Sequence, residues 1–277
     1  MWETTPRKVL CAIETARCRA ALEYAGRAAR QRRAGVHLVH VEPPAYGGSS
    51  FQGESQWLGG RILSEAGRVL EQLLADAALP VTTELARGPV VETLVADSAY
   101  ACLVVLQHRG MHPEAGSPVL SVQEVVAGAG APIVAVPADW RSATSPETPV
   151  VTVGVADRTS SSRVVREALH VAELAGARLR LVHGRASLPR VDRPDLVGEF
   201  GAVLAECPQV AVEQIVIDGS ATTALLRQAR DSQLLVVGRR RPVLGTPHPD
   251  QFDHALLRLS PVPVMVVDQV DAASLIG

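Results

Sequence analysis

Aromatic residues are scarce in this chain. Phe, Trp and Tyr make up 3% of its 277 residues, although 47% of the residues are hydrophobic. The cores must therefore be built from Val, Leu, Ile and Ala. Val and Ile favour strands, whereas Ala and Leu favour helices. This composition indicates a layered α/β protein, in which helices cover a buried parallel sheet.

A strong charge of either sign is also missing. The formal net charge is −2, and Lys8 is the only lysine, so arginine supplies the other cations. A nearly neutral chain has no general attraction for nucleic acid or for an anionic membrane. We therefore expect neither of these as a partner.

Long apolar runs are absent as well. No run approaches the roughly 20 residues of a membrane helix, and the polar start, Met1–Pro6, does not resemble a signal peptide. The four cysteines have no CxxC or metal-like spacing: Cys11, Cys18, Cys102 and Cys207. They are expected to be reduced structural thiols in a cytoplasmic protein.

Several enzyme motifs are lacking. We find no P-loop, no nucleophile elbow and no dinucleotide-binding GxGxxG after a first strand. Two loop clusters carry metal-ligand side chains without helical spacing: His108, His112 and Glu114, and then His248, Asp250, Asp253 and His254. We interpret both as ordinary loop residues, and expect neither a metal nor catalysis.

What the chain does contain is an internal repeat. The apolar run at 103–106 and the polar residues after it recur at 234–241, and the run at 131–137 recurs at 262–267. One constant spacing separates Gly88 from Gly219, Leu94 from Leu225 and Pro132 from Pro263. A constant spacing over about fifty residues indicates a tandem duplication.

The repeat predicts two domains. They span residues 1–138 and 149–268, with a linker at 139–148 and a tail at 269–277. In the first domain, strands at 9–13, 36–41, 81–85, 103–106 and 131–137 alternate with helices at 19–33, 61–78, 90–99 and 121–128. This alternation predicts right-handed crossovers and, in each half, an open parallel α/β sheet with flanking helices.

A second, larger spacing relates the beginnings of the halves and pairs Glu14 with Asp157 and His40 with His183. The two histidines are interpreted as packing or hydrogen-bonding groups. Because the second spacing exceeds the first, the first half contains an insertion of about a dozen residues. We place it in a Pro-, Gly- and Ser-rich loop at 44–57, which is either a lid or a tolerated insertion.

The expected ligand site lies beyond the carboxyl ends of the strands. In each half an acid, Glu14 or Asp157, closes the first strand, and a polar loop closes the fourth. A loop that cradles phosphate needs glycine, because its backbone N–H groups must approach the anion without an intervening Cβ.

A VVG-type strand, a loop, a helix and a PVxVV-type strand, found twice in one chain, resemble a tandem universal stress protein. The resemblance covers nearly the whole chain. It implies cytoplasmic stress-response proteins with five-stranded, Rossmann-like domains similar to the adenine nucleotide alpha-hydrolases. One branch of that family binds ATP through G-x2-G-x9-G-S/T after the fourth strand. The resemblance also implies that Glu14 and Asp157 lie near the ribose.

This motif is incomplete in both halves. The matching positions are Gln107, Gly110, Leu120 and Ser121 in the first half, and Gly238, Arg241, Gln251 and Phe252 in the second. Each lost glycine puts a side chain where phosphate should meet bare backbone, which weakens binding. The family's arginine is present as Arg109 and Arg240. The run 239–241 either holds an anion or is a solvated charge run.

We therefore expect a non-catalytic regulatory protein that binds a protein partner or a small ligand, with ATP binding weakened or lost. The alternative is an adenine-nucleotide binder with ATP as its cofactor, an arginine-based phosphate site and at most weak hydrolysis. The candidate binding residues are Glu14, Arg109, Gly110, Ser121, Asp157, Gly238, Arg240 and Arg241. The closing strands, at 133–136 and 264–267, are predicted to join the halves as a pseudo-dimer, and tandem chains to form homodimers.

Overall fold

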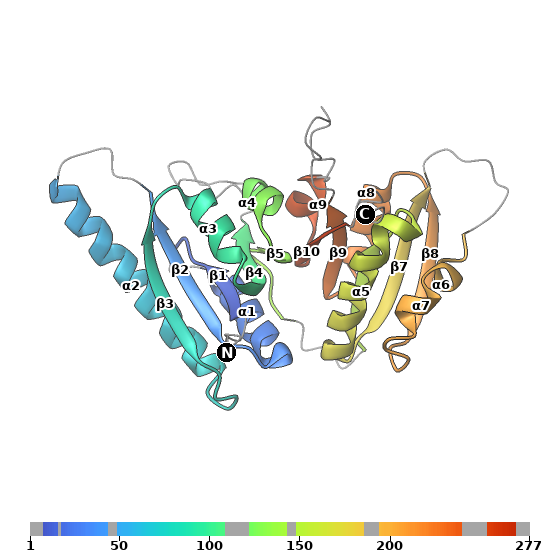
Figure 1. The fold of residues 1–277 in the computed structure, drawn as a ribbon, viewed down its shortest axis with the longest axis horizontal. Coiled ribbons are helices and arrows are strands. Elements are labelled where there is room, and N and C mark those ends of the chain that lie inside the picture. The colour runs from blue at the N-terminus through green and yellow to red at the C-terminus, as the bar shows by residue number, and fades with distance from the viewer. Residues whose placement is uncertain are drawn as a thin grey trace, which may run out of the picture. The chain divides into compact units, whose positions relative to one another are not determined.

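The computed structural model describes residues 8–15, 18–43, 49–108, 122–142, 148–185, 194–239 and 254–269 (Figure 1). The chain divides into two compact units, Met1–Ser142 and Ala143–Gly277, which we call the first and the second module. The dividing point lies inside the segment predicted as a linker.

The first module is built on a parallel sheet. Its strands are β1 (Lys8–Ala12), β2 (Val36–Glu42), β3 (Val81–Arg87), β4 (Ala101–His108) and β5 (Ile133–Pro137), in the order β3-β2-β1-β4-β5. The central strands β1 and β4 are apolar over most of their length, as expected of strands whose two faces are both covered by helices.

The second module repeats this sheet. Its strands are β6 (Val150–Gly154), β7 (Arg178–Arg185), β8 (Val212–Asp218), β9 (Leu234–Arg239) and β10 (Val264–Asp268), in the order β10-β9-β6-β7-β8. All of these pairings are parallel. The predicted fold class, two Rossmann-like α/β units in tandem, is therefore confirmed.

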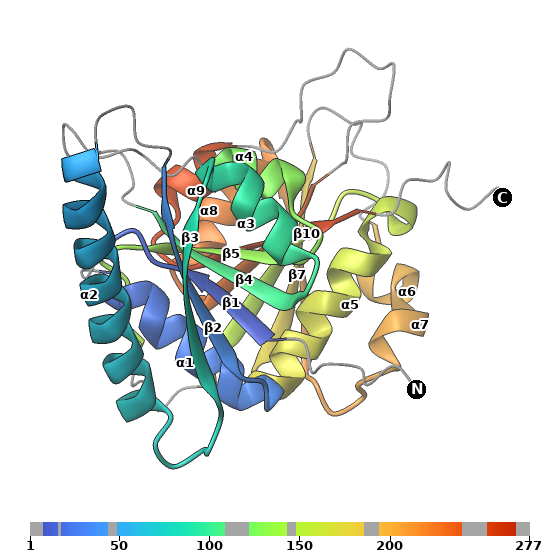
Figure 2. The ribbon, with the colours of Figure 1, turned by 60° about the vertical axis from the view of Figure 1, so that its left-hand side comes forward.

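Helices cover both faces of each sheet. In the first module they are α1 (Arg19–Arg32), α2 (Ser49–Leu73), α3 (Val90–Ser98) and α4 (Val122–Gly128). Helix α1 contacts α2, and α3 contacts α4, so that the two pairs lie on opposite faces (Figure 2). The second module contains α5 (Arg158–Ala175), α6 (Leu196–Glu199), α7 (Gly201–Leu204), α8 (Ala221–Ala229) and α9 (His254–Leu259). Among the described residues, no helix is both long and apolar enough to cross a membrane.

Helix α2 corrects the predicted loop. It begins at Ser49 rather than at Arg61, so residues 49–57 of the expected insertion are helical, whereas 44–48 lie outside the described residues. A composition rich in Pro, Gly and Ser led us to predict a loop here, and Gly59 and Gly60 lie inside the helix although glycine has a low helix propensity. A Cβ on Gly59 would lie 2.7 Å from Leu85 Cδ1, so the helix backbone packs directly on β3. This tertiary contact outweighs the low helix propensity of glycine.

The end of α1 suggests a stabilising substitution. Arg33 follows the helix with φ = 51°, a left-handed conformation that glycine adopts more readily, and the corresponding residue after α5 is Gly176, with φ = 60°. We expect Arg33→Gly to raise the free energy of unfolding of the first module by about 1 kcal/mol. Urea unfolding followed by tryptophan fluorescence measures this change, because Trp2, Trp57 and Trp140 all belong to the first module. Gly176→Ala should act in the opposite direction on the second module.

Candidate functional site

The candidate site of each module lies at the carboxyl ends of its central strands. Strand β1 pairs with β2 on one side and with β4 on the other, and β6 has the same position between β7 and β9. Strand order reverses at these positions, where open parallel sheets bind ligands. Glu14, Gln107, Asp157 and Gly238 all lie at or near this edge of their modules.

Two histidines fix the ends of the first strands. Nδ1 of His40 lies 2.6 Å from the carbonyl oxygen of Ile13, and Nδ1 of His183 lies 3.0 Å from that of Val155. A carbonyl only accepts hydrogen bonds, so Nδ1 donates in both rings. The hydrogen-bonding role predicted for these histidines is confirmed.

The two acids that follow the first strands do not occupy equivalent positions. Strand pairing makes Val9 of β1 equivalent to Val151 of β6, and this spacing is shorter by a single position than the one that links Glu14 to Asp157. Counted from the ends of the strands, Asp157 lies one position further along the chain than Glu14 does, so the predicted pair lies at different distances from β1 and β6. A difference of one residue in the length of the segments after these strands cannot be detected when the two repeats are aligned without gaps.

Asp157 caps α5. Its Oδ1 accepts a hydrogen bond from the backbone N–H of Ser160 at 2.9 Å, and its Oδ2 accepts one from the Ser160 hydroxyl at 2.6 Å. An N-cap aspartate satisfies backbone donors that the helix leaves unpaired. In α1, by contrast, the N-cap residue Cys18 makes no side-chain capping bond within the described residues.

Gln107 supplies the bond that Cys18 does not make. Its side-chain oxygen, Oε1, accepts a hydrogen bond from the backbone N–H of Ala21, in the first turn of α1, at 3.3 Å. The start of a helix is where an anion would bind. Gln107 also lies at the first glycine position of the phosphate motif. Its side chain therefore accepts a hydrogen bond from a backbone N–H that a glycine at this position would leave available to phosphate.

A different glutamine fills the corresponding space in the second module. Gly238 retains the motif glycine, but a Cβ placed on it would lie 2.5 Å from Nε2 and 2.6 Å from Cγ of Gln269. The backbone N–H of Gln269 donates to the carbonyl oxygen of Arg239 at 2.8 Å, which anchors this residue beyond β10. The bare backbone at Gly238 is therefore covered by a side chain from the next strand.

Arg239 departs from both interpretations of the arginine run. Only 2% of the residue is exposed, and its Nε donates to Oδ1 of Asp268 at 2.5 Å. It is therefore neither solvated nor an open anion site, but half of a buried ion pair. The corresponding residue of the first module is His108, and burial lowers the pKa of its ring, an effect that Asp139 partly opposes.

Glu42 is a residue at this edge that our sequence analysis missed. It is 6% exposed, and its Oε2 lies 3.4 Å from Nε of Arg87, while its Oε1 is buried with no hydrogen-bond partner in the described part of the chain. Strand pairing sets Glu42 beside Arg87 and, in the second module, Arg185 beside Asp218. The sequence does contain a signal for this pair. The charges are opposite within each repeat, and their order along the chain is reversed between the repeats.

Several predicted residues lie outside the described ranges. These are Arg109, Gly110 and Ser121 of the first module and Arg240 and Arg241 of the second. The two loop clusters with metal-ligand side chains also fall largely there. Within the described ranges, no group of three or more His, Cys, Asp or Glu residues is arranged to hold a metal ion.

Sequence comparison relates the chain to known proteins. Residues 5–137 match the model of the universal stress protein family. The universal stress proteins Rv1996 of Mycobacterium tuberculosis and Mb2019 of Mycobacterium bovis are each 28% identical to this chain over 285 aligned residues, which cover 89% of this chain and 90% of each relative. The similarity to these relatives therefore includes both modules.

Solved structures share the fold. A universal stress protein from Archaeoglobus fulgidus, at 18% identity, matches 94% of this chain and 98% of its own with a TM-score of 0.71. A putative universal stress protein from Pseudomonas aeruginosa, at 17% identity, matches 96% of this chain and 94% of its own with a TM-score of 0.60. At such identities the likeness shows the fold alone.

Proposed function

Since residues 5–137 match the universal stress protein family and relatives of that family align with most of the chain, we propose that the chain is a tandem universal stress protein: a non-catalytic regulatory protein of the stress response, with ATP binding weakened or lost in both modules. It acts by binding a protein partner or a small ligand. Fold alone does not decide between nucleotide binding and its loss, so the proposal depends on the residues at the strand ends.

The observation that carries the proposal is the glutamine at each phosphate position. Gln107 bonds to the first turn of α1, and Gln269 lies over the backbone of Gly238. A triphosphate would have to displace a satisfied hydrogen bond in the first module and a packed side chain in the second. Each displacement reduces the net binding free energy, because an unpaired buried donor costs about 1–3 kcal/mol.

The absence of catalysis is proposed on similar grounds. Hydrolysis of a nucleotide needs a base and a metal next to the phosphate. Both carboxylate oxygens of Asp157 accept hydrogen bonds from Ser160 and thereby cap α5. Glu14, the acid that follows β1, lies at a different distance from its strand than Asp157 does from β6.

Titration with Mg-ATP tests the proposal. We expect about 1 mM Mg-ATP to leave the thermal midpoint of the wild-type protein unchanged, and no hydrolysis above background. A ligand at about 100 times its Kd would stabilise by about 2.7 kcal/mol and raise the midpoint by several degrees. Gln107→Gly should lower stability by about 1 kcal/mol through the lost capping bond, and it should bind Mg-ATP better than wild type does.

Gln214→Ala is the matched control, because Oε1 of Gln214 also accepts from a helix start, the N–H of Leu196 at 2.8 Å, but away from the strand ends. It should leave nucleotide binding unchanged. Tight binding of Mg-ATP by the wild-type protein would support the adenine-nucleotide binder instead, and its loss in Arg240→Ala would identify the arginine-based phosphate site.

A further inference from the structure

The outward face of α2 carries exposed apolar side chains. Its inward face is a regular stripe of buried residues, Leu63, Ala66 and Leu70, on the side where α2 contacts β2, β3 and α1. On the opposite side, Trp57 is 63% exposed and its neighbour Leu58 is 54% exposed. Tryptophan is enriched at the centres of protein interfaces, and adjacent exposed apolar residues are characteristic of surfaces that bind a partner. The outward face of α2 is therefore a candidate interaction surface.

Trp57 begins a row of four side chains along this face. Residues four positions apart lie next to each other on the surface of a helix. One such row, which we call the α2 ridge, consists of Trp57, Arg61, Glu65 and Val69. Arg61 and Glu65 are exposed, and Val69 is half-buried. The α2 ridge thus has an apolar residue at each end and two opposite charges in the middle.

The two charges of the α2 ridge do not pair with each other. The Arg61 guanidinium lies over the ring of Trp57 instead, 4.7 Å from its centroid. An arginine that precedes a glutamate by four positions is the less favourable order for an ion pair on a helix. Within the described residues, neither Arg61 nor Glu65 makes an ion pair. Both charges are therefore available to a second molecule.

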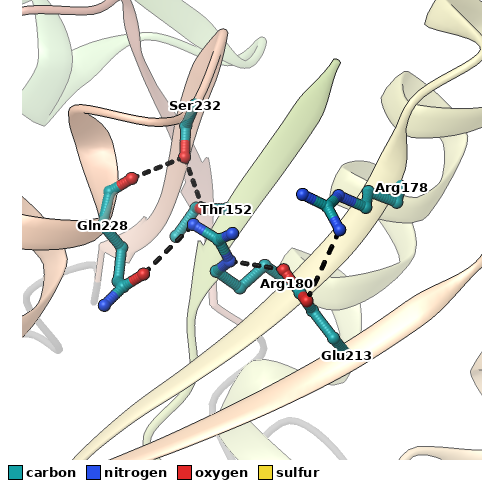
Figure 3. Close-up of polar contacts among 6 residues, drawn as sticks. All are labelled: Thr152, Arg178, Arg180, Glu213, Gln228 and Ser232. Atoms are coloured by element: carbon teal, nitrogen blue, oxygen red, sulfur yellow. Dashed lines mark hydrogen bonds and ion pairs between the residues drawn. The ribbon is translucent and has the colours of Figure 1, made fainter. Parts of the chain in front are cut away.

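A cluster in the second module shows how charges are paired within one unit. Figure 3 shows two arginines of β7 that face Glu213: Nε of Arg180 donates to its Oε1 at 2.6 Å, and Nη1 of Arg178 lies 3.8 Å from its Oε2. Nη1 of Arg180 also donates to the side-chain oxygen of Gln228 at 3.1 Å. These arginines obtain their counter-ion from the neighbouring strand, β8. The α2 ridge faces away from its sheet, so only another molecule can supply its counter-ions.

The α2 ridge is complementary to itself when two copies of it run in opposite directions. If Arg61 of one chain faces Glu65 of the other, two-fold symmetry places Glu65 of the first chain opposite Arg61 of the second. The same alignment brings each Trp57 to Val69 of the other chain, because both pairs are centred on Leu63. A parallel alignment would instead set like charges side by side. The order of residues along the ridge therefore favours an antiparallel pair of α2 helices.

We propose that α2 is a self-association surface, through which two copies of this chain pair with their α2 helices antiparallel. Trp57 and Val69 supply the apolar contacts, and the charges of Arg61 and Glu65 fix direction and register. The second module has no counterpart among its described helices, since α6 and α7, which lie between β7 and β8, have 4 residues each. Each chain therefore has one such surface, and the assembly closes as a dimer.

Analytical ultracentrifugation of the full chain over a range of protein concentrations tests this surface. We expect the wild-type protein to dimerise. Arg61→Glu and Glu65→Arg should each weaken self-association about tenfold, because every dimer then contains two pairs of like charges. Trp57→Ala should weaken it by at least about tenfold, because it removes the largest apolar contact twice. A mixture of Arg61→Glu with Glu65→Arg should associate as the wild type does, because each chain supplies the charge that the other needs.

Two control variants alter similar side chains elsewhere. Arg178→Ala removes an exposed arginine that already faces a carboxylate of its own module (Figure 3). Tyr100→Ala removes an exposed aromatic ring that lies outside α2. Both variants should self-associate as the wild type does, because neither residue belongs to the α2 ridge.

The mixture of the two charge variants separates an interface from a local effect, because damage to the fold of one chain cannot be corrected by a different chain. A monomeric wild type would overturn the proposal. So would a dimer that all the α2 variants leave intact, or a mixture of Arg61→Glu and Glu65→Arg that associates no better than either variant alone. Binding of a monomeric wild type to anionic lipid vesicles would assign this face to a membrane surface instead.

Discussion

Replacement of Asp268 by alanine is expected to lower the free energy of unfolding of the second module by about 3–5 kcal/mol. Asp268 accepts a hydrogen bond from Nε of Arg239 at 2.5 Å, and both residues are buried. Removal of the carboxylate breaks a buried ion pair and leaves the Arg239 guanidinium charged in a buried position. Urea unfolding followed by circular dichroism measures the loss, together with hydrogen exchange of β9 and β10.

Two further variants show whether the broken ion pair or lost packing causes the loss of stability. Asp231→Ala removes an exposed acid of the same module and should change stability by less than about 0.5 kcal/mol. The double replacement Arg239→Leu with Asp268→Leu removes both charges, and it should recover most of the stability that Asp268→Ala loses. If the double variant were as unstable as the single one, lost packing rather than the broken ion pair would be the cause.

Replacement of Trp140 by alanine should destabilise the first module by about 3–5 kcal/mol. Trp140 follows β5 and is 7% exposed. Its ring meets that of Tyr24 edge to face, with centroids 5.8 Å apart, and the guanidinium of Arg27 lies 5.2 Å from the centroid of each ring. The residue thereby fastens the segment after the closing strand to α1, and its loss removes aromatic, cation–π and packing contacts together.

Thermal unfolding by circular dichroism suits this test, because the substitution removes a fluorescent reporter. Tyr100→Ala is the control: Tyr100 is 82% exposed, so its removal should have little effect. Arg27→Ala should give a smaller loss than Trp140→Ala, about 1 kcal/mol, because it leaves the two rings in contact. Equal losses for Tyr100→Ala and Trp140→Ala would contradict the packing role of Trp140.

The fold could be predicted from sequence because its determinants are periodic and repeated. Continuous apolar runs such as Leu103–Leu106 and Ile133–Val136 form buried strands. Because the sequence is duplicated, each element could be recognised in two copies. Helix α2 was mispredicted over residues 49–57 because its local composition favours a loop, whereas the contact of Gly59 with Leu85 is formed by distant parts of the chain. The pairing of the modules through their closing strands stays a prediction.

The candidate site was less predictable. The loss of motif glycine at Gln107 is visible in the sequence, but its bond to Ala21 depends on how α1 approaches β4. Gln269 lay in a segment interpreted as a tail, and only the structure brings it over Gly238. Arg239 belongs to a run of like charges, and its burial could not be inferred without knowing that Asp268 pairs with it across two parallel strands.

The oppositely charged residues that face each other at the ends of the second and third strands, in reversed order in the two modules, have a consequence for how the duplicated chain reaches its native state. Neighbouring repeats with similar strands can exchange them during folding, which produces misassembled species. If β2 paired with β8, Glu42 would stand beside Asp218, and if β7 paired with β3, Arg185 would stand beside Arg87, whereas each native pairing joins opposite charges. Like charges side by side in a sheet are unfavourable. The opposite polarity of the two copies thus directs each strand to its own module.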